Sequence, residues 1–332
     1  MKLWREKRTW IGKHAVARLA RLTPESIESI AIIKHAAYGD LLCTRPFLVT
    51  LRKYFPRASL TFSAINHYRR GIPEDLVDRV HLIPGIHDPH RLVDSWRAMK
   101  QLGHHNLLFD LTESTPSFLL SKLTPADFKI GFQHRGFHKW VYDAAILRAE
   151  YRFEAETFLE QLHILGLQYD LPLDYAYPAS AMQRATPYVV YFPTASAANK
   201  SWPAEYFIEL IGQMAVQYAQ YEHIILSGLA GWEIERATQM AGALTQHANV
   251  VKLAAGPEDA SLLKGARALV ANDTGIRHLG IALGTPSVGI FFHAPPFGYW
   301  PRFGRHEVAF EPDGGIPPVA HVKQALCRIL AG

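Results

Sequence analysis

The chain has 332 residues, of which 48% are hydrophobic and 20% are charged, and its formal net charge is +5. This length is typical of two domains, and a chain of this size buries enough apolar surface to fold without disulfides. Two cysteines are too few for a disulfide framework or a four-thiolate metal site, which fits a reducing cytosol, and no apolar run is long enough to span a membrane. The composition therefore excludes a disordered chain, a secreted mini-protein and an integral membrane protein.

Positive charge is concentrated in residues 1–22, which hold seven Lys or Arg and one Glu. More than the whole net charge lies in this arm, so a basic nucleic-acid-binding face on the rest of the protein is not expected. Tryptophan and aliphatic residues interleave with the cations. This pattern predicts either a helix on an anionic membrane surface or a solvated helical extension that packs on the body. An organellar transit peptide is a further alternative, whereas a secretory signal is not expected because no unbroken apolar core follows the charges.

The first half of the body alternates short apolar strands with helices. Strands are predicted over 30–33, 59–62, 79–83 and 106–110, and helices over 41–55 and 155–165. Such alternation predicts a mostly parallel sheet with helices on both faces. Residues 173–187 then carry prolines and show no clear period, as expected of a linker.

The second half repeats this layout, although no repeat can be aligned. Strands are predicted over 188–192, 223–226, 250–253, 268–271 and 287–292, and helices over 203–218, 233–244 and 274–283. The expected domains are an arm over 1–29, a first domain over 30–172, a linker over 173–187 and a second domain over 188–332, whose last helix has the option of packing back on the first. Ligands of open parallel sheets bind beyond the carboxyl ends of the strands, so the loops that follow strands are the candidate site loops.

The loop after the first predicted strand contains Tyr38, Gly39 and Asp40. Gly39 suits a tight turn, and Asp40 suits two roles, a cap of the following helix or a general base held toward a ligand. One side chain does only one of these well, because a free base points its carboxylate away from its own helix. The residues of this loop leave both roles open.

Two loops of the second half suit an anion. Lys200 stands just before a predicted helix, where it either adds a cation beside the positive helix end or is a solvated loop residue. Asp273, Thr274 and Gly275 open another helix directly after a strand, and the unpaired N–H groups there suit a pyrophosphate. The alternative at this helix is N-capping by Asp273 with a buried structural His278.

Several common site motifs are missing from the sequence. It has no Walker-type phosphate loop, no dinucleotide-binding glycine fingerprint, no serine nucleophile elbow and no Asp-x-Asp pair. The 17 histidines do not recur with Cys or Glu at metal-ligand spacing, so no metal site is predicted. His104 and His105 are expected to be exposed residues at a helix end.

Four ordered blocks of the sequence resemble the family 9 glycosyltransferases, the lipopolysaccharide heptosyltransferases. The first-half blocks are 32–40 (IIKHAAYGD) with 51–56 (LRKYFP), and 129–132 (KIGF). The second-half blocks are 188–193 (YVVYFP) with 200–207 (KSWPAEYF), and 272–279 (NDTGIRHL) with 282–286 (ALGTP) and 289–291 (GIF). The resemblance covers nearly the whole chain from residue 30 and is most specific in the last block.

The resemblance implies an α/β chain of GT-B architecture, with two Rossmann-like domains whose parallel sheets face each other across a central cleft. The first domain would bind the acceptor and the second the nucleotide sugar. The implied activity is an inverting, metal-independent transfer of a sugar, usually heptose from ADP-heptose, onto a lipopolysaccharide core or a related glycan. No cofactor is implied. The protein would be cytoplasmic and held at the inner face of the cytoplasmic membrane through residues 1–22.

By the same resemblance, Asp40 is the catalytic base that deprotonates the acceptor hydroxyl. The implied donor-binding residues are Lys200, Glu233, Asp273, Thr274, Gly275 and His278. Glu233 is the expected ribose partner, although Glu235 is close enough to compete. The acceptor-binding residues are expected to be Tyr38, Asp110 and Glu113.

The chain departs from the family pattern at three places. Ala36 and Ala37 stand where many relatives have Ser or Thr, and residues 110–113 (DLTE) replace a common Asp-x-Gln-Gly loop, so both departures bear on the acceptor. Arg277 replaces a usually uncharged residue and bears on the donor phosphates. Two other functions remain open, a GT-B-type nucleotide-sugar epimerase or hydrolase, and a catalytically silent scaffold that binds a nucleotide sugar.

Overall fold

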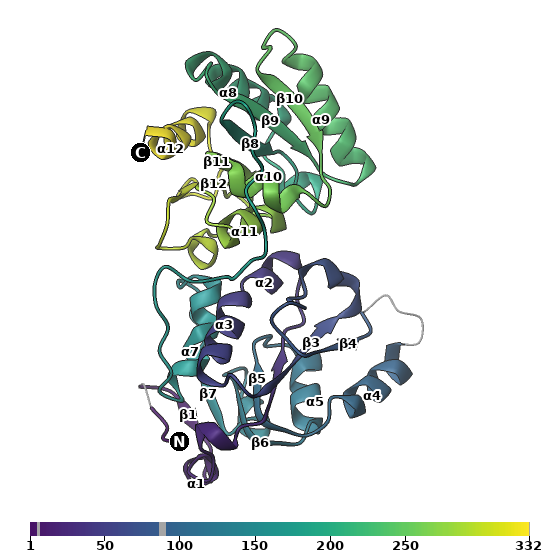
Figure 1. Cartoon of the computed structure of the whole chain (residues 1–332), viewed down its shortest axis with the longest axis vertical. Coiled ribbons are helices and arrows are strands. Elements are labelled where there is room, and N and C mark those ends of the chain that lie inside the picture. The colour runs from purple at the N-terminus through teal and green to yellow at the C-terminus, as the bar shows by residue number, and fades with distance from the viewer. Residues whose placement is uncertain (5–6, 86–90, 332) are drawn as a thin grey trace. The chain divides into compact units, whose positions relative to one another are not determined.

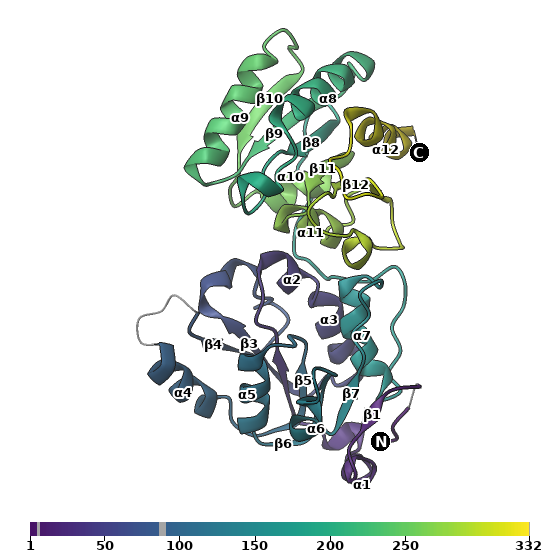
Figure 2. The ribbon, with the colours of Figure 1, turned by 180° about the vertical axis from the view of Figure 1, so that it is seen from behind.

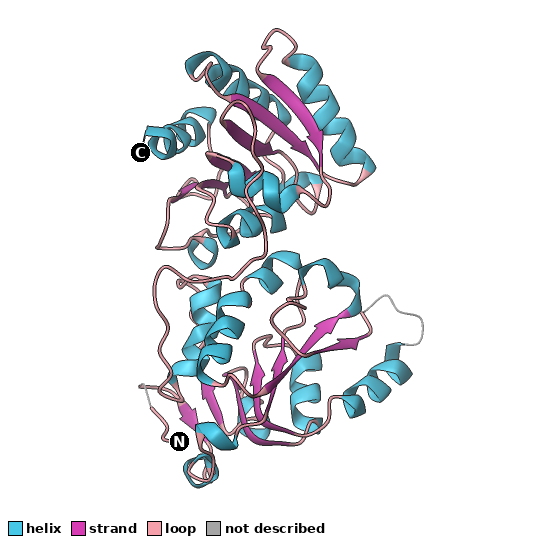
Figure 3. Ribbon diagram, viewed as in Figure 1, coloured by secondary structure: helices cyan, strands magenta, loops and turns pink. Residues whose placement is uncertain are grey.

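The computed structural model describes residues 1–4, 7–85 and 91–331. The chain forms two compact units, residues 1–176 and 177–332, and each is built on its own sheet (Figure 1). The division falls inside the segment 173–187 that the sequence marks as a linker. Figure 3 shows the chain between the last helix of unit 1 and the first strand of unit 2 as loop.

Unit 1 contains a seven-stranded sheet. Its strands are β1 (Trp10–Ile11), β2 (Ser29–Ile33), β3 (Ser59–Ile65), β4 (Arg79–Ile83), β5 (His105–Asp110), β6 (Ala126–Phe132) and β7 (Ala144–Ile146). Their order across the sheet is β1-β7-β6-β5-β2-β3-β4, and each neighbouring pair is parallel except β1 with β7. The order therefore reverses between β2 and β5, since β3 and β4 extend the sheet on one side and β5 to β7 extend it on the other.

Helices connect these strands and cover both faces of the sheet (Figures 1 and 2). They are α1 (Ala15–Leu19), α2 (Tyr38–Leu42), α3 (Arg45–Tyr54), α4 (Arg91–Gln101), α5 (Thr115–Leu123), α6 (His138–Val141) and α7 (Glu154–His163), with 3₁₀ turns η1 (Pro24–Ser26) and η2 (Asn66–Gly71). Leu108 of β5 is buried with Met99 of α4 and Leu120 of α5, whereas its neighbour Phe109 meets Phe47 of α3 at 5.1 Å between ring centroids. Successive strand residues point to opposite faces, so a strand that is covered on both faces is apolar throughout.

The N-terminal arm is part of unit 1. Its strand β1 pairs with β7 as an antiparallel edge strand, and Leu19 and Leu22 are buried in the body. Arg18 donates to the Asp143 carboxylate at 2.7 Å. The long helix predicted for residues 1–22 is therefore wrong, because the arm forms an edge strand and a helix of five residues. Trp4 and Val16 stay exposed, and contact of the arm with a membrane surface stays a prediction. The alternative of an extension that packs on the body describes the arm, although its helix α1 is only five residues long.

His104 and His105 lie at the start of β5, and only His105 differs from expectation. His105 lies inside β5 rather than at a helix end, is buried, and shares a hydrogen bond of 2.9 Å with the Leu102 carbonyl. His104 is exposed as predicted, and its Nε2 lies 3.1 Å from the Asp127 carboxylate. The strand begins one residue earlier than the sequence suggested, which explains the difference.

Unit 2 contains a six-stranded sheet that is parallel throughout. Its strands are β8 (Tyr188–Phe192), β9 (Glu222–Ser227), β10 (Val250–Ala254), β11 (Ala268–Asn272), β12 (Ser287–Ile290) and β13 (His306–Ala309). Its helices are α8 (Ala204–Gln217), α9 (Gly231–Ala243), α10 (Asp259–Gly265), α11 (Gly275–Ala282) and α12 (Val319–Ala331), with 3₁₀ turns η3 (Ala198–Lys200) and η4 (Phe297–Tyr299). The order is β10-β9-β8-β11-β12-β13, so it reverses between β8 and β11.

The last helix, α12, packs within unit 2. Its Val322, Leu326 and Ile329 are buried in one cluster with Phe207 of α8 and Val288 of β12. These three positions recur at helical spacing, so one face of α12 is apolar. Burying this face needs no contact with the first domain, which the sequence left open. In the part of the chain that the structure describes, no helix has both the length and the apolar character required to cross a bilayer.

Candidate functional site

In unit 1 the strand order reverses between β2 and β5, and ligands of open parallel sheets bind at the carboxyl edge of such a reversal. The loops that follow these two strands are tied together. The Leu111 N–H donates to the Ile33 carbonyl at 2.9 Å, and the His35 N–H donates to Thr112 Oγ1 at 2.8 Å. These loops thus form one edge of unit 1 on which site residues gather.

Asp40 lies at this edge, in the first turn of α2. The cap position of α2 belongs to Ala37, and no side chain caps the helix there. Asp40 is half-buried, and its carboxylate makes no hydrogen bond or ion pair with any residue in the described part of the chain. The alternative of Asp40 as a helix cap is therefore wrong, and its role as a general base stays a prediction.

Tyr38 opens α2 and packs against η2. A Cβ atom placed on Gly71 would lie 2.9 Å from the Tyr38 ring, and the Arg70 guanidinium lies 5.4 Å from the centroid of that ring. The ring is half-buried beside the loop that carries Asp40. Contact of Tyr38 with an acceptor stays a prediction, and the packing on η2 fixes where such a contact would be made.

Asp110 does not face a ligand. Its side chain is fully buried, and its carboxylate accepts hydrogen bonds from Tyr142 Oη at 2.7 Å, Ser121 Oγ at 3.1 Å and the Thr112 N–H at 2.8 Å. Burial raises the pKa of Asp110, and these donors offset part of the rise. The prediction that Asp110 contacts the acceptor is therefore wrong, because the carboxylate is used inside the protein to shape the loop that carries Thr112 and Glu113.

Glu113 belongs to a network of charged side chains. Its φ is +64°, and its carboxylate lies 3.0 Å from His134 Nδ1 and 3.5 Å from Arg148 Nη1. Arg148 also pairs with Glu154 at 2.5 Å, and Glu154 pairs with Lys34 at 3.4 Å. The network joins the loops after β2, β5 and β6 to α7. The sequence singled out Glu113 alone, although Lys34, a charged residue directly after a buried strand, was a signal for the rest.

His35 is a residue of this edge that reasoning from the sequence missed. Its Nε2 lies 3.2 Å from Ser63 Oγ, which in turn lies 2.9 Å from His81 Nδ1. Burial, with the charges of His81 and Lys34, lowers the pKa of His35 to about 3, so the ring is neutral at physiological pH. Its Nδ1 is buried without a partner among the described residues, which is rare in folded proteins.

In unit 2 the strand order reverses between β8 and β11, and Asn272 ties the loops that follow these strands. Asn272 is the last residue of β11 and is fully buried. Its Oδ1 accepts from the Trp202 N–H at 2.8 Å, and its Nδ2 donates to the Thr194 carbonyl at 3.5 Å. Both ends of the loop after β8 are thereby held beside the start of α11.

Thr274 caps α11, and its Oγ1 accepts from the Ile276 N–H at 3.1 Å. N-capping by Asp273 is therefore wrong, and the Asp273 carboxylate instead lies 3.8 Å from His278 Nε2. Burial opposes ionisation of Asp273, but the hydrogen bond and charge of His278, with the charges of two further cations, one of them Lys200, lower its pKa. The carboxylate is thus ionised at neutral pH.

Lys200 ends η3 and is exposed. Its ammonium makes no hydrogen bond or ion pair with a described residue, yet its charge acts on Asp273. The lysine therefore lies close to the start of α11, where Gly275 is the first helical residue. First-turn N–H groups and a nearby unpaired cation are the arrangement that a phosphate group requires.

Both basic side chains in the first turn of α11 are buried. His278 is buried, as the alternative for this helix expected, and its ring meets the Tyr299 ring edge-to-face at 5.4 Å between centroids; contact of His278 with a donor stays a prediction. Arg277 is fully buried, donates to the Tyr299 carbonyl at 2.8 Å and lies 5.0 Å from the centroid of the Phe291 ring. A guanidinium held in this way supports the loop after β12.

Glu233 and Glu235 have different surroundings. The Glu233 carboxylate accepts from Thr194 Oγ1 at 2.8 Å and from the Ala230 N–H at 2.9 Å, which places it beside the loops after β8 and β9. Glu235 is exposed and accepts from Gln239 Nε2 at 3.3 Å. Of the two, Glu233 lies at the carboxyl edge of the sheet, and its contact with a ribose stays a prediction.

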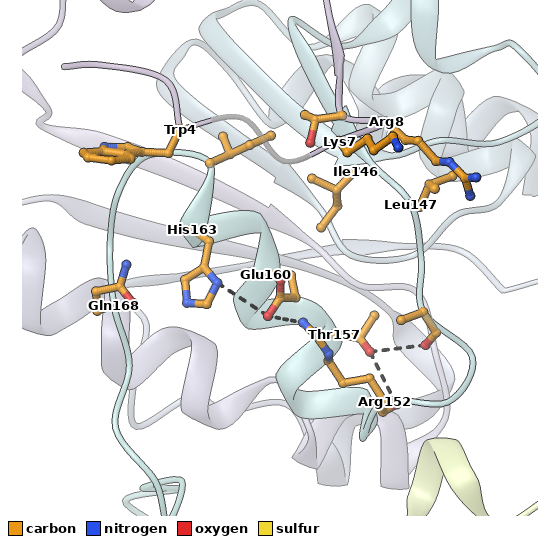
Figure 4. A pocket seen from close by; sticks show the side chains of 13 residues that line it. Trp4, Lys7, Arg8, Ile146, Leu147, Arg152, Thr157, Glu160, His163 and Gln168 are labelled. Atoms are coloured by element: carbon orange, nitrogen blue, oxygen red, sulfur yellow. Dashed lines mark hydrogen bonds and ion pairs between the residues drawn. The ribbon is translucent and has the colours of Figure 1, made fainter.

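A pocket of about 450 Å³ lies elsewhere in unit 1, between the N-terminal arm and α7 (Figure 4). Its lining includes Trp4, Lys7, Arg8, Arg152 and Glu160. Glu160 pairs with Arg152 and with His163 inside the pocket, so its carboxylate is neutralised within the protein. The pocket contains none of the predicted site residues and marks the seam where the arm packs on the body.

Comparison with known proteins points to one family. Residues 95–309 match the sequence profile of glycosyltransferase family 9 (heptosyltransferase). Lipopolysaccharide heptosyltransferase 1 of Pseudomonas aeruginosa is 32% identical over 164 residues, which cover 48% of this chain and 45% of that enzyme. The matched region thus spans about half the length of this curated relative.

Solved heptosyltransferases share the fold. E. coli heptosyltransferase WaaC with ADP-2-deoxy-2-fluoro heptose aligns with a TM-score of 0.72 at 21% identity, over 91% of this chain and 99% of WaaC. E. coli ADP-heptose lipopolysaccharide heptosyltransferase II aligns with a TM-score of 0.68 at 17% identity, over 91% and 98% of the two chains. These likenesses confirm the predicted α/β fold with two mostly parallel sheets. The family profile matches well over half of the length of this chain, so the chain belongs to glycosyltransferase family 9, the heptosyltransferase family.

Proposed function

We propose that this protein is an inverting glycosyltransferase that moves a heptose from ADP-heptose to a hydroxyl of a lipopolysaccharide core. The observation that carries the proposal is the Asp40 carboxylate, held at the strand-reversal edge of unit 1 without a partner among the described residues. The family match and the ADP-heptose analogue bound by WaaC support the choice of donor. The Pseudomonas aeruginosa relative supports the class of acceptor.

In the proposed reaction, Asp40 takes the proton of the acceptor hydroxyl as its oxygen attacks the anomeric carbon of the donor sugar. The new C–O bond forms while the bond to the diphosphate breaks, so a single displacement inverts the configuration, and ADP leaves with the electron pair. Lys200 and the first-turn N–H groups of α11 stabilise the negative charge that develops on the diphosphate. Glu233 accepts hydrogen bonds from the ribose hydroxyls.

A thermal-shift series with ADP-heptose, ADP, UDP-sugars and GDP-sugars tests the donor. A ligand that binds only the folded state adds about 2.7 kcal/mol at 100 times its Kd, so the ADP species should raise Tm while the others do not. Product analysis with and without a lipopolysaccharide core then tests the reaction, and heptose should appear on the glycan. Free heptose formed without an acceptor would identify a hydrolase, an altered nucleotide sugar an epimerase, and binding without turnover a silent scaffold.

Glu233→Gln is expected to weaken ADP binding about 10-fold, because the neutral amide loses the charge-assisted hydrogen bonds of the carboxylate. Glu235→Gln is the matched control, since it makes the same change two residues along the same helix and is expected to leave the Kd unchanged. Isothermal titration calorimetry with ADP measures both variants. A loss confined to Glu235→Gln would give the ribose role to Glu235.

A further inference from the structure

Unit 1 exposes apolar side chains next to the loop that carries Glu113. Leu119 and Leu123 of α5 are 47% and 41% exposed, and Phe137 and Trp140 near and in α6 are 56% and 77% exposed. The exposed cations Lys122, Arg135 and Lys139 lie among them in the sequence. These seven residues are called the aromatic–basic patch below.

The patch spans α5 and α6, which lie next to each other in unit 1 (Figure 2). Lys122 Nζ donates to the Trp140 carbonyl at 2.7 Å and joins the two helices. The Phe137 ring lies 6.2 Å from the ring of Phe118, which is buried on α5. These two contacts hold the helices α5 and α6 together, so the exposed apolar side chains of the patch stand on packed helices.

The outward face of α5 is unusual for a helix at a protein surface. Leu120 and Ser121 point into the unit and are buried, while Leu119 and Leu123 occupy the exposed positions four residues apart. Such positions normally carry polar residues, and exposed apolar side chains that cluster mark an interaction surface.

The charge of this region favours an anionic partner. Residues 113–143 contain four Lys or Arg and three acids, but Glu113 is paired with His134 and Arg148, and Asp143 is paired with Arg18. Asp127 is engaged with His104 at 3.1 Å and with Asn106 at 2.8 Å, at the start of β6. An exposed tryptophan flanked by basic residues is suited to the headgroup region of a membrane, where the ring has an apolar and a wet side. We propose that the aromatic–basic patch binds the surface of an anionic lipid bilayer.

This surface lies close to the acceptor loop. The Phe118 ring stacks on the His134 ring at 5.6 Å between centroids, and His134 Nδ1 lies 3.0 Å from the Glu113 carboxylate. A bilayer bound at the patch would place a membrane-anchored acceptor beside unit 1 at Glu113. This use of the patch rests on the proposed function, whereas the lipid contact itself depends only on the residues of the patch.

Vesicle co-sedimentation of the full chain tests the proposal. Binding to vesicles of phosphatidylglycerol and phosphatidylethanolamine is expected to fall about 25-fold for Arg135→Gln/Lys139→Gln, since each cation near an anionic surface contributes about fivefold. Phe137→Ser/Trp140→Ser is expected to lower binding at least 10-fold, whereas the conservative Trp140→Phe should retain it within about twofold. The matched control Val216→Ser removes a side chain of unit 2 that is 70% exposed and should leave binding unchanged.

Two results would overturn the proposal. The first is equal vesicle binding by the wild type and both patch variants, and the second is a loss confined to the arm variant Lys2→Gln/Lys7→Gln/Arg8→Gln, which would place the contact on the N-terminal arm. ADP binding and transfer to a delipidated, water-soluble acceptor should be unchanged in the patch variants. If the protein binds vesicles through the patch but transfers no sugar, the lipid contact is supported and the proposed function is wrong.

Discussion

Asp40→Asn is expected to lower the rate of sugar transfer about 10²–10⁴-fold, the usual contribution of a general base. Asparagine preserves the size of the side chain and cannot take the proton of the acceptor hydroxyl. The fold should be unaffected, because the Asp40 carboxylate makes no hydrogen bond or ion pair with a described residue and the cap position of α2 is occupied by Ala37. Donor binding should also be unaffected, because the proposed phosphate and ribose contacts are made by unit 2.

The measurement is the rate of ADP release with saturating ADP-heptose and a lipopolysaccharide core, together with Tm and the Kd for ADP. Asp170→Asn is the matched control, since it neutralises an exposed carboxylate of unit 1 whose partner is the exposed Lys53, at 3.1 Å, and it should keep the wild-type rate. Full activity of Asp40→Asn would remove Asp40 from catalysis. A lost rate together with a lowered Tm would instead show that Asp40 has a structural role.

The sequence predicted most strands of both sheets, including the edge strand β4 at 79–83, but missed β1, β6, β7 and β13. The predicted strand 188–192 coincides with β8, because a strand buried on both faces is a short, continuous apolar run. The edge strand β1 has two residues and pairs with a segment more than 130 residues away, so its local pattern carried no signal. The helix predicted over 41–55 is two helices, since Pro46 lies in the first turn of α3 and suits the start of a new helix.

The same distinction applies to the site. Asp40 lies in the short helix that follows β2, and Lys200 and Thr274 lie in the segments that connect β8 and β11 to α8 and α11, so the strand–helix pattern of the sequence predicted them at the carboxyl edges of the sheets. The burial of Asp110 depends on Ser121 and on Tyr142, which is 32 residues further along the chain. A contact of this kind is set by how α5 packs on α6, which Tyr142 follows, and no local spacing predicts it.

The N-terminal arm shows how one sequence pattern fits two different structures. Its interleaved cations and apolar residues are typical of a membrane-bound helix, but they also suit an edge strand and a short helix that pack on unit 1. The distinction is whether Leu19 and Leu22 meet lipid or protein, and the structure buries both. Trp4 and Val16 of the arm stay exposed, as do the aromatic residues of the patch on α5 and α6.

Lys200→Ala is expected to raise the Kd for ADP about 10–100-fold. A hydrogen bond between charged groups contributes about 1.5–3 kcal/mol, and this loss of binding free energy gives an effect of that size. The lysine is exposed and has no partner among the described residues, so its removal should not lower Tm. Its charge helps to lower the pKa of Asp273, and removing it therefore brings that pKa closer to its usual range. Lys200→Arg should recover part of the affinity, since it retains the positive charge.

Calorimetry with ADP and with adenosine separates a phosphate contact from a general defect of unit 2. The proposed contact is to the diphosphate, so Lys200→Ala should weaken ADP binding and leave adenosine binding unchanged, with an ADP affinity that is also less sensitive to salt. Lys252→Ala is the matched control, because Lys252 is an exposed lysine of β10 whose ammonium donates to Thr238 Oγ1 at 2.9 Å. An equal loss of ADP and adenosine affinity would show that Lys200 supports the nucleoside or the loop after β8. A loss restricted to ADP would place the diphosphate at the start of α11, where the charge of the leaving group develops.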